Sequence, residues 1–254
     1  MKSEKPLEPH PALPEYYPDL AHRPAFVRGL FDRTARYYDH VNRLLSFGSG
    51  SWYRRQALLR AGLRPTMAVL DVAIGTGLVA RQALAIVGDR QAVVGLDISA
   101  GMLVEVRRQL DLPLIQGLME QLPVADACFD LVSMGYALRH VTDLNATFRE
   151  FHRVLQPGGV LLILEIARPA QRWRRALLKF YLGRLIPLLG RLTTGQRDMQ
   201  TLMRYYWDTI EHCVPPETII QAIRDAGFHE AGCEVQFDLF RAYCGRKLPL
   251  KPGD

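Results

Sequence analysis

Leu70-Asp-Val-Ala-Ile-Gly-Thr-Gly77 is the stretch that decides the fold, because an acidic residue and two glycines stand between a predicted strand and a predicted helix. Apolar residues 67–72 have the pattern of a buried strand, and residues 78–87 have the length and periodicity of a helix. Gly75 and Gly77 would occupy the turn, where a missing Cβ lets the backbone approach a ligand and free N–H groups favour an electronegative partner. The stretch predicts a binding site for a nucleotide-like ligand.

A second carboxylate narrows the choice of ligand. Asp97 ends the next apolar run, about 20 residues beyond the turn, the distance at which a carboxylate takes a ribose diol. A nicotinamide dinucleotide would call for a third glycine where this chain has Ala80. Asp71, just before the turn, would repel a pyrophosphate but suits the cationic methionine end of S-adenosylmethionine. The pattern favours S-adenosylmethionine over a dinucleotide.

The rest of the chain continues the alternation of strands and helices. Predicted strands cover residues 92–97, 112–115, 128–134 and 160–166, with helices at 100–110, 144–155 and 215–226 and a closing pair of strands within 233–246. Such alternation predicts an α/β fold with a doubly wound, largely parallel sheet.

The predicted organisation is a single domain with additions. Residues 1–25 are charged and Pro-rich and are expected to form a flexible N-terminal arm, and residues 249–254 a tail. Within the domain, 26–248, helical spacing over 26–62 predicts a lid above the site, and 169–213 a helical insertion before the last strands.

Composition excludes several classes of protein. The chain has 254 residues, 48% of them hydrophobic, and a net charge of +6. No apolar run approaches the roughly 18 residues of a membrane span, and no signal core precedes the domain, so we expect a cytoplasmic protein. The four cysteines lack paired spacing, and neither a metal site nor a nucleic-acid partner is expected.

Several longer motifs carry a family resemblance. They are Phe31–Gly48, Gly95-Leu-Asp-Ile-Ser-Ala-Gly-Met102, Glu120-Gln-Leu-Pro123, Ala137-Leu-Arg-His-Val-Thr-Asp143 and Arg153–Glu165. Together with the turn, they make residues 26–170 resemble the ubiquinone/menaquinone-biosynthesis C-methyltransferases, class I enzymes that use S-adenosylmethionine. The resemblance implies a Rossmann-like, seven-stranded sheet and methylation of a ring carbon of a lipophilic quinol or phenol, with S-adenosylhomocysteine as product.

The resemblance also implies a cofactor site. Asp97 would take the ribose hydroxyls, Met102 would pack on adenine, and Asp71 would lie near the ammonium. The other residues expected there are Ala73, Gly75, Thr76, Gly77, Ile98, Leu118, Met119 and Gly135. Where the family commonly has Gly, Asp and a polar residue, this chain has Ile74, Leu78 and Leu118, which would crowd and dry the methionine end and remove an acceptor for adenine.

Ring methylation also needs an aligned aromatic acceptor and a group that takes a proton. By resemblance, Arg139 would stabilise a phenolate, and His140, standing where the family usually has Asn, is a candidate general base. Tyr205 aligns with a substrate-pocket tyrosine of the family. The residues expected to contact the substrate are Tyr38, Asp39, Asn42, Tyr136 and Tyr206.

Residues 168–189 combine basic and apolar side chains at helical spacing. Arg168, Arg172, Arg175 and Lys179 recur at steps of four, three and four residues, so they would form one stripe. The segment is either an interfacial helix on the inner face of a membrane or an insertion helix packed on the domain.

Three other functions remain open at this point. The acceptor could be another small aromatic metabolite, because the match beyond residue 170 is loose. The reaction could modify a quinone without methylating it, as in the amination step of rhodoquinone biosynthesis. The chain could also be a non-catalytic subunit of a quinone-synthesis complex, and a homo-oligomer is a further expectation.

Overall fold

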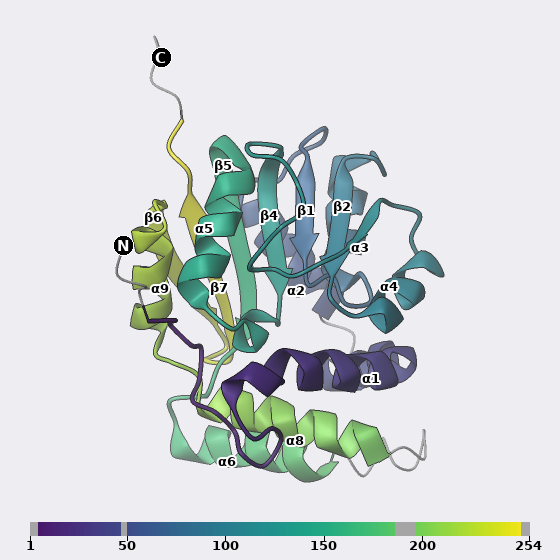
Figure 1. Ribbon diagram of the computed structural model, residues 1–254, viewed down its shortest axis with the longest axis vertical. Coiled ribbons are helices and arrows are strands. Elements are labelled where there is room, and N and C mark those ends of the chain that lie inside the picture. The colour runs from purple at the N-terminus through teal and green to yellow at the C-terminus, as the bar shows by residue number, and fades with distance from the viewer. Residues whose placement is uncertain (1–4, 47–49, 186–196, 250–254) are drawn as a thin grey trace.

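A seven-stranded sheet forms the centre of the molecule (Figure 1). The computed structural model describes residues 5–46, 50–185 and 197–249. The strand order is β3-β2-β1-β4-β5-β7-β6, with β7 antiparallel to both neighbours and all other pairs parallel. The strands are β1 (Val69–Val72), β2 (Val93–Asp97), β3 (Leu114–Gln116), β4 (Phe129–Gly135), β5 (Leu155–Ile166), β6 (His229–Gln236) and β7 (Phe240–Arg246). The predicted doubly wound sheet is confirmed.

Helices cover both faces of this sheet. Figure 1 shows α5 (Leu144–Val154) and α9 (Pro216–Asp225) in front, with α2 (Gly50–Arg60) and α3 (Leu78–Val87) behind. Each face has its own apolar core, one containing Phe148 of α5 and the other Leu58 of α2. Strand β1 is buried along its whole length because it is covered on both sides, which explains its nearly unbroken apolar sequence.

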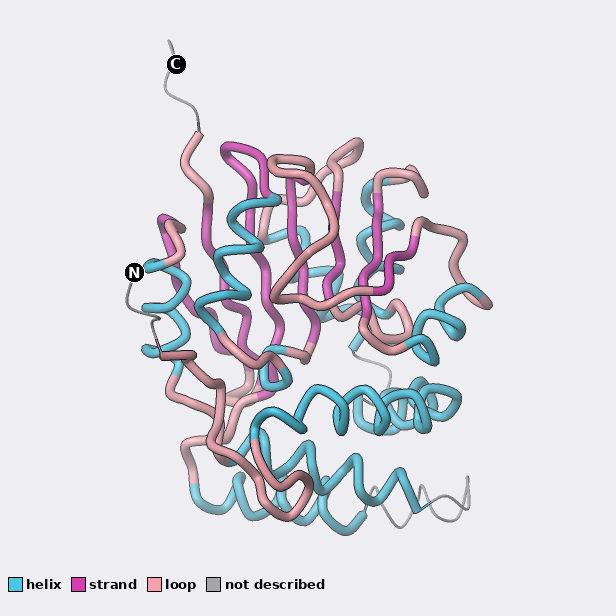
Figure 2. Tube along the Cα trace, viewed as in Figure 1, coloured by secondary structure: helices cyan, strands magenta, loops and turns pink. Residues whose placement is uncertain are grey.

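A helical layer lies across the carboxyl ends of the strands (Figures 1 and 2). It contains α1 (Arg23–Ser46), α8 (Arg197–Glu211) and α6 (Arg172–Phe180), which runs into the π-helical turn η3 (Tyr181–Leu185). The short helix α4 (Ala100–Arg107) packs against α1, where the Asp32 carboxylate accepts hydrogen bonds from Ser99 Oγ (2.6 Å) and the Gly101 N–H (3.0 Å). In the described residues, α1 and α2 (Gly50–Arg60) lie in the segment predicted as a lid, 26–62. Helices α6 and α8 and the turn η3 lie in the segment predicted as an insertion, 169–213.

The residues before α1 pack onto this layer. Leu13 and Tyr17 are buried in a cluster with residues of α1 and α8, ahead of the single turn η1 (Leu20–His22). The carbonyls of Leu7 and Pro9 accept hydrogen bonds from the N–H groups of Leu144 and Val214, each at 2.8 Å. The sequence predicts a flexible arm here because prolines and charges dominate it, whereas the structure shows aromatic and apolar side chains in contact with the domain.

None of the helices in the described ranges combines the length and the apolar character needed to cross a membrane.

Candidate active site

A cavity opens between the carboxyl ends of β1, β2 and β4 and the helices α1 and α2. It encloses about 790 Å³ of space free of atoms, part of it open to solvent. Most of the residues predicted from the sequence line it: Asp71, Ala73, Gly75, Thr76, Asp97, Ile98, Met102, Met119, Gly135, Tyr38, Tyr136 and His140. A cavity with a few convergent polar groups at the carboxyl ends of parallel strands is the usual small-molecule site of an open α/β sheet.

The glycine turn and Asp97 form one hydrogen-bonded unit. Asp97 accepts hydrogen bonds from the N–H groups of Gly75 (2.8 Å, to Oδ2) and Ser99 (2.8 Å, to Oδ1). Gly75 has φ +57°, and a Cβ placed there would meet no atom within 4 Å in the described residues. The backbone of the turn is thus open to a ligand, while Asp97 keeps lone pairs for hydroxyl donors.

Both buried carboxylates of the cavity have raised pKa values. Asp71, at the end of β1, accepts hydrogen bonds from Ser133 Oγ (2.6 Å) and from the Ala80 N–H (3.0 Å). Burial raises the pKa of Asp71 to about 7 and that of Asp97 to about 6, against the hydrogen bonds that favour the charged forms. A ligand that brings a positive charge to Asp71 would restore its ionisation.

These groups fit S-adenosylmethionine. The open turn at Gly75 accommodates a closely bound ligand, Asp97 offers acceptors for a ribose, Asp71 offers one for an ammonium, and Met102 provides a buried apolar surface. When bound, S-adenosylmethionine supplies an electrophilic methyl group.

Two residues predicted to bind the cofactor do not line the cavity. Gly77 has φ +83°, and a Cβ there would lie 2.7 Å from Leu110 Cδ1, so this glycine is required for packing beside α4. The side chain of Leu118 is exposed, whereas its neighbours Gly117 and Met119 line the cavity. Leu118 begins a turn that the Gln121 N–H closes on the Leu118 carbonyl (3.3 Å), and its side chain lies on the solvent side of that turn.

The two unusual residues of the turn, Ile74 and Leu78, both line the cavity. A Cβ on Gly95 would lie 2.2 Å from Ile74 Cδ1, so the end of the Ile74 side chain fills space beside β2 that Gly95 leaves free. Both residues therefore give the cavity apolar surface, and Ile74 also packs into the core behind the turn.

His140 lies in an aromatic cluster at the other end of the cavity. Its ring packs edge-on to Phe31 (5.3 Å between centroids) and is stacked on Tyr205 (5.5 Å). Neither ring nitrogen has a hydrogen-bond partner among the described residues, although the side chain is buried. Burial, together with the charges of Arg139 and Arg23, lowers its pKa well below the usual value, so the imidazole is neutral near pH 7.

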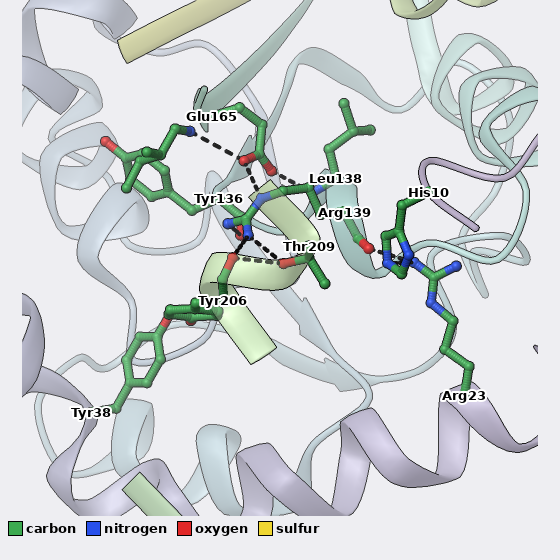
Figure 3. Close-up of polar contacts among 10 residues, drawn as sticks. His10, Arg23, Tyr38, Tyr136, Leu138, Arg139, Glu165, Tyr206 and Thr209 are labelled. Atoms are coloured by element: carbon green, nitrogen blue, oxygen red, sulfur yellow. Dashed lines mark hydrogen bonds and ion pairs between the residues drawn. The ribbon is translucent and has the colours of Figure 1, made fainter. Parts of the chain in front are cut away.

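Arg139 does not line the cavity, which corrects its expected contact with substrate. Its Nε donates to Glu165 Oε2 (2.8 Å) and its Nη1 to Thr209 Oγ1 (2.8 Å), and the side chain is fully buried. Figure 3 shows the guanidinium held between these partners, with Arg23 donating to the Arg139 carbonyl. Because Glu165 pairs with the Arg139 guanidinium and also accepts a hydrogen bond from the Leu138 N–H, it holds the turn η2 (Leu138–His140) in place. Arg139 thereby fixes the position of His140.

Tyr205, Tyr206 and Asp39 also lie outside the cavity lining. Tyr205 is fully buried behind His140, and the Tyr206 hydroxyl is hydrogen-bonded to that of Tyr38 at 2.5 Å. Asp39 accepts hydrogen bonds from Thr76 Oγ1 and from Gln109 Nε2 (3.1 Å), so it joins α1 to the glycine turn. These residues support the cavity from behind. The side chain of Asn42 lies outside the described residues.

Arg54 is the chief cavity residue that the sequence interpretation missed. It lies on α2, is 7% exposed, and places its guanidinium 5.2 Å from the centroid of the Tyr136 ring. Arg54 and Arg55 are adjacent in the sequence, and no local pattern indicates which of them faces inward. Phe31 also lines the cavity, and its sequence motif alone predicts no role for its side chain.

The fold and the site define a class I S-adenosylmethionine-dependent methyltransferase. The decisive features are the seven-stranded sheet with antiparallel β7 and the two carboxylates at the ends of β1 and β2. The chain belongs to the ubiE/COQ5 methyltransferase family, whose model matches residues 20–238.

Comparisons with individual proteins agree with this assignment. Over 211 residues the chain is 35% identical to ubiquinone/menaquinone biosynthesis C-methyltransferases UbiE of Shewanella sp. strain W3-18-1 and Shewanella oneidensis, covering 80% of this chain and 83% of each relative. Among solved structures, a possible histamine N-methyltransferase of Thermotoga maritima superposes with a TM-score of 0.60 at 19% identity, covering 87% of this chain and 99% of that one. A methyltransferase of Aquifex aeolicus superposes with a TM-score of 0.57 at 16% sequence identity, covering 77% of this chain and 89% of that one. These structures share the fold.

Proposed function

We propose that this enzyme methylates a ring carbon of a lipophilic quinol or phenol in quinone biosynthesis. The observation that carries the proposal is the aromatic end of the cavity, where Phe31, Tyr38, Tyr136 and His140 surround space next to the cofactor groups. Flat aromatic ligands stack well on such side chains. The names of the relatives in Shewanella supply the quinone class.

The residues at this end have distinct roles in the proposed reaction. Replacing a ring hydrogen by a methyl group releases one proton, so a proton acceptor is needed. The neutral imidazole of His140 has one unprotonated ring nitrogen, free of protein partners among the described residues, that can accept a hydrogen bond from a substrate hydroxyl and then its proton. Arg139 and Glu165 act through position, since they fix the turn that carries His140.

Mass spectrometry tests the proposed reaction directly. The protein would be incubated with labelled S-adenosylmethionine and a quinol extract, and a labelled methyl group on a quinone is the expected product. Label on another aromatic metabolite, a change of quinone mass without label, or no product would instead support the other acceptor, the amination or the non-catalytic subunit.

We also propose that α6 brings the enzyme to the inner surface of an anionic membrane. Trp173, Leu177 and Phe180 are 63%, 60% and 51% exposed and recur at helical spacing, so they form one apolar face. Residues 168–185 contain six basic residues and no acidic one. This combination is typical of helices that lie in the membrane interface.

The structure refines how the basic residues of α6 are used. Arg175 pairs with Glu211 of α8, and Lys179 Nζ lies 5.9 Å from the Trp207 ring centroid. Part of the predicted basic stripe therefore packs inward on α8, whereas the apolar face points outward.

Flotation with vesicles that contain phosphatidylglycerol tests this surface. The double substitution Trp173→Ser and Leu177→Ser should abolish binding, while Val104→Ser, which changes an exposed apolar residue of α4, should leave it intact. Equal binding by all three proteins, or none by the unmodified protein, would refute membrane association. A homo-oligomer or a quinone-synthesis complex stays a prediction.

A further inference from the structure

Arg54 is a buried cation without an anionic partner among the described residues. It is 7% exposed, makes no ion pair within 4 Å, and its Nε has no hydrogen-bond partner there. Burying a guanidinium without a compensating charge is costly. By contrast, Arg139, which is more deeply buried, donates hydrogen bonds to Glu165 and Thr209 (Figure 3). The partners of Arg139 explain why its charge can be buried, whereas the burial of Arg54 still needs an explanation.

The position of Arg54 points to a ligand rather than to an internal contact. Arg23 also has unpartnered nitrogens, but it does not line the cavity, whereas Arg54 does. The Tyr136 ring holds the Arg54 guanidinium at the end of β4. A free donor thus borders the cavity from α2, where a bound anion can accept its hydrogen bonds.

A guanidinium and a carboxyl group border the same end of the cavity without pairing with each other. Asp71 lies one residue before the end of β1, and its register partner Ser133 lies on β4, three residues before Tyr136. Arg54 is close enough to influence the charge of Asp71, yet the two form no ion pair. A ligand that carries both an ammonium and a carboxylate would satisfy both groups at once.

We propose that Arg54 binds the carboxylate of the methionine portion of S-adenosylmethionine, while Asp71 takes its ammonium. A guanidinium presents planar paired donors that match a carboxylate, which explains the use of arginine at this position. The contact makes α2 a specificity determinant, because only a cofactor with an intact amino-acid end neutralises the buried charge. Tyr136 orients the guanidinium and so acts as a positioning residue.

Calorimetry with two ligands tests the proposal without measuring turnover. S-adenosylhomocysteine carries the amino-acid end, whereas 5′-methylthioadenosine shares the adenosine and the sulfur but lacks it. Arg54→Gln should weaken binding of S-adenosylhomocysteine by roughly 10- to 100-fold, the range for a hydrogen bond between charged groups, and leave binding of 5′-methylthioadenosine within about twofold. Arg55→Gln, the matched change on the same helix, should alter neither affinity.

A second measurement uses the unmodified protein and so does not depend on the folding of a variant. Decarboxylated S-adenosylhomocysteine should bind roughly 10- to 100-fold more weakly than S-adenosylhomocysteine to the unmodified protein. Arg54→Gln should reduce that difference to less than about threefold. The proposal would be overturned if the unmodified protein bound S-adenosylhomocysteine and its decarboxylated form with equal affinity. It would also be overturned if Arg54→Gln weakened the binding of both ligands by the same factor.

Discussion

The two ends of the cavity are built in different ways. At the cofactor end, backbone N–H groups of the turns after β1 and β2 hold the Asp97 carboxylate, and an N–H group in the first turn of α3 holds that of Asp71. At the acceptor end, side chains of α1 and α8 surround His140, and they come together only when both helices pack over the sheet. The cofactor end therefore depends on the sheet, whereas the acceptor end depends on helix packing, so substitutions at the two ends should affect different measured quantities.

The largest expected effect comes from removing Glu165, which supports the acceptor end. Glu165→Ala leaves the Arg139 guanidinium buried without its partner and should lower the free energy of unfolding by about 3–5 kcal/mol. Urea denaturation measures this, and Asp111→Ala, which breaks an exposed pair with Arg90, should cost less than about 1 kcal/mol. If Glu165→Ala lowered the free energy of unfolding no more than Asp111→Ala does, the buried pair between Arg139 and Glu165 would contribute little to stability.

His140 should affect turnover without affecting the cofactor. His140→Phe keeps an aromatic ring but removes the nitrogens, and we expect kcat to fall by about 100-fold or more because a proton acceptor is lost. Binding of S-adenosylhomocysteine, measured by calorimetry, should stay within about twofold. An unchanged kcat would exclude His140 as the base and leave it as a packing residue.

Asp97 should show the opposite pattern. Asp97→Ala should weaken binding of S-adenosylhomocysteine by about 1.5–3 kcal/mol, because hydrogen bonds to the carboxylate are lost. Titration calorimetry measures the change, and kcat at saturating cofactor should fall much less than in His140→Phe. If the affinity is unchanged, the ribose lies elsewhere and the two ends cannot be told apart in this way.

Cofactor affinity should depend on pH through Asp71. Its pKa of about 7 in the free protein means that it is mostly protonated at pH 6 and mostly charged at pH 8, and only the charged form balances an ammonium. Affinity for S-adenosylhomocysteine should therefore rise with pH, by about tenfold between these values. Asp71→Asn should flatten that dependence, and a slope that survives the substitution would have to come from another group.

The hydrogen bond between Tyr38 and Tyr206 should give the smallest effect. Tyr38→Phe removes one of the two hydroxyls and should cost about 0.5–1.5 kcal/mol, measured as a higher KM for the aromatic acceptor. The dissociation constant of S-adenosylhomocysteine should not change. A change in that constant would mean that the packing of α1 also controls the cofactor end.

The same division explains what the sequence could and could not predict. Asp71 and Asp97 are predicted because strand, turn and helix follow one another along the chain, so local pattern suffices, whereas Met102 is predicted from the family resemblance. The partner of Arg139 could not be found in this way, because Glu165 lies on the neighbouring strand 26 residues away. Arg54 was missed because its inward orientation depends on how α2 packs against the sheet.

The N-terminal residues have a consequence for the order of folding. The Leu7 and Pro9 carbonyls bond to residues 144 and 214, and Arg23 donates to the Arg139 carbonyl. These N-terminal residues therefore complete their contacts only after the chain has been synthesised as far as residue 214, and closing such long loops is slow. We expect pulsed hydrogen exchange to protect β1 and β4 before α1, so the cofactor end would form first and the acceptor end last.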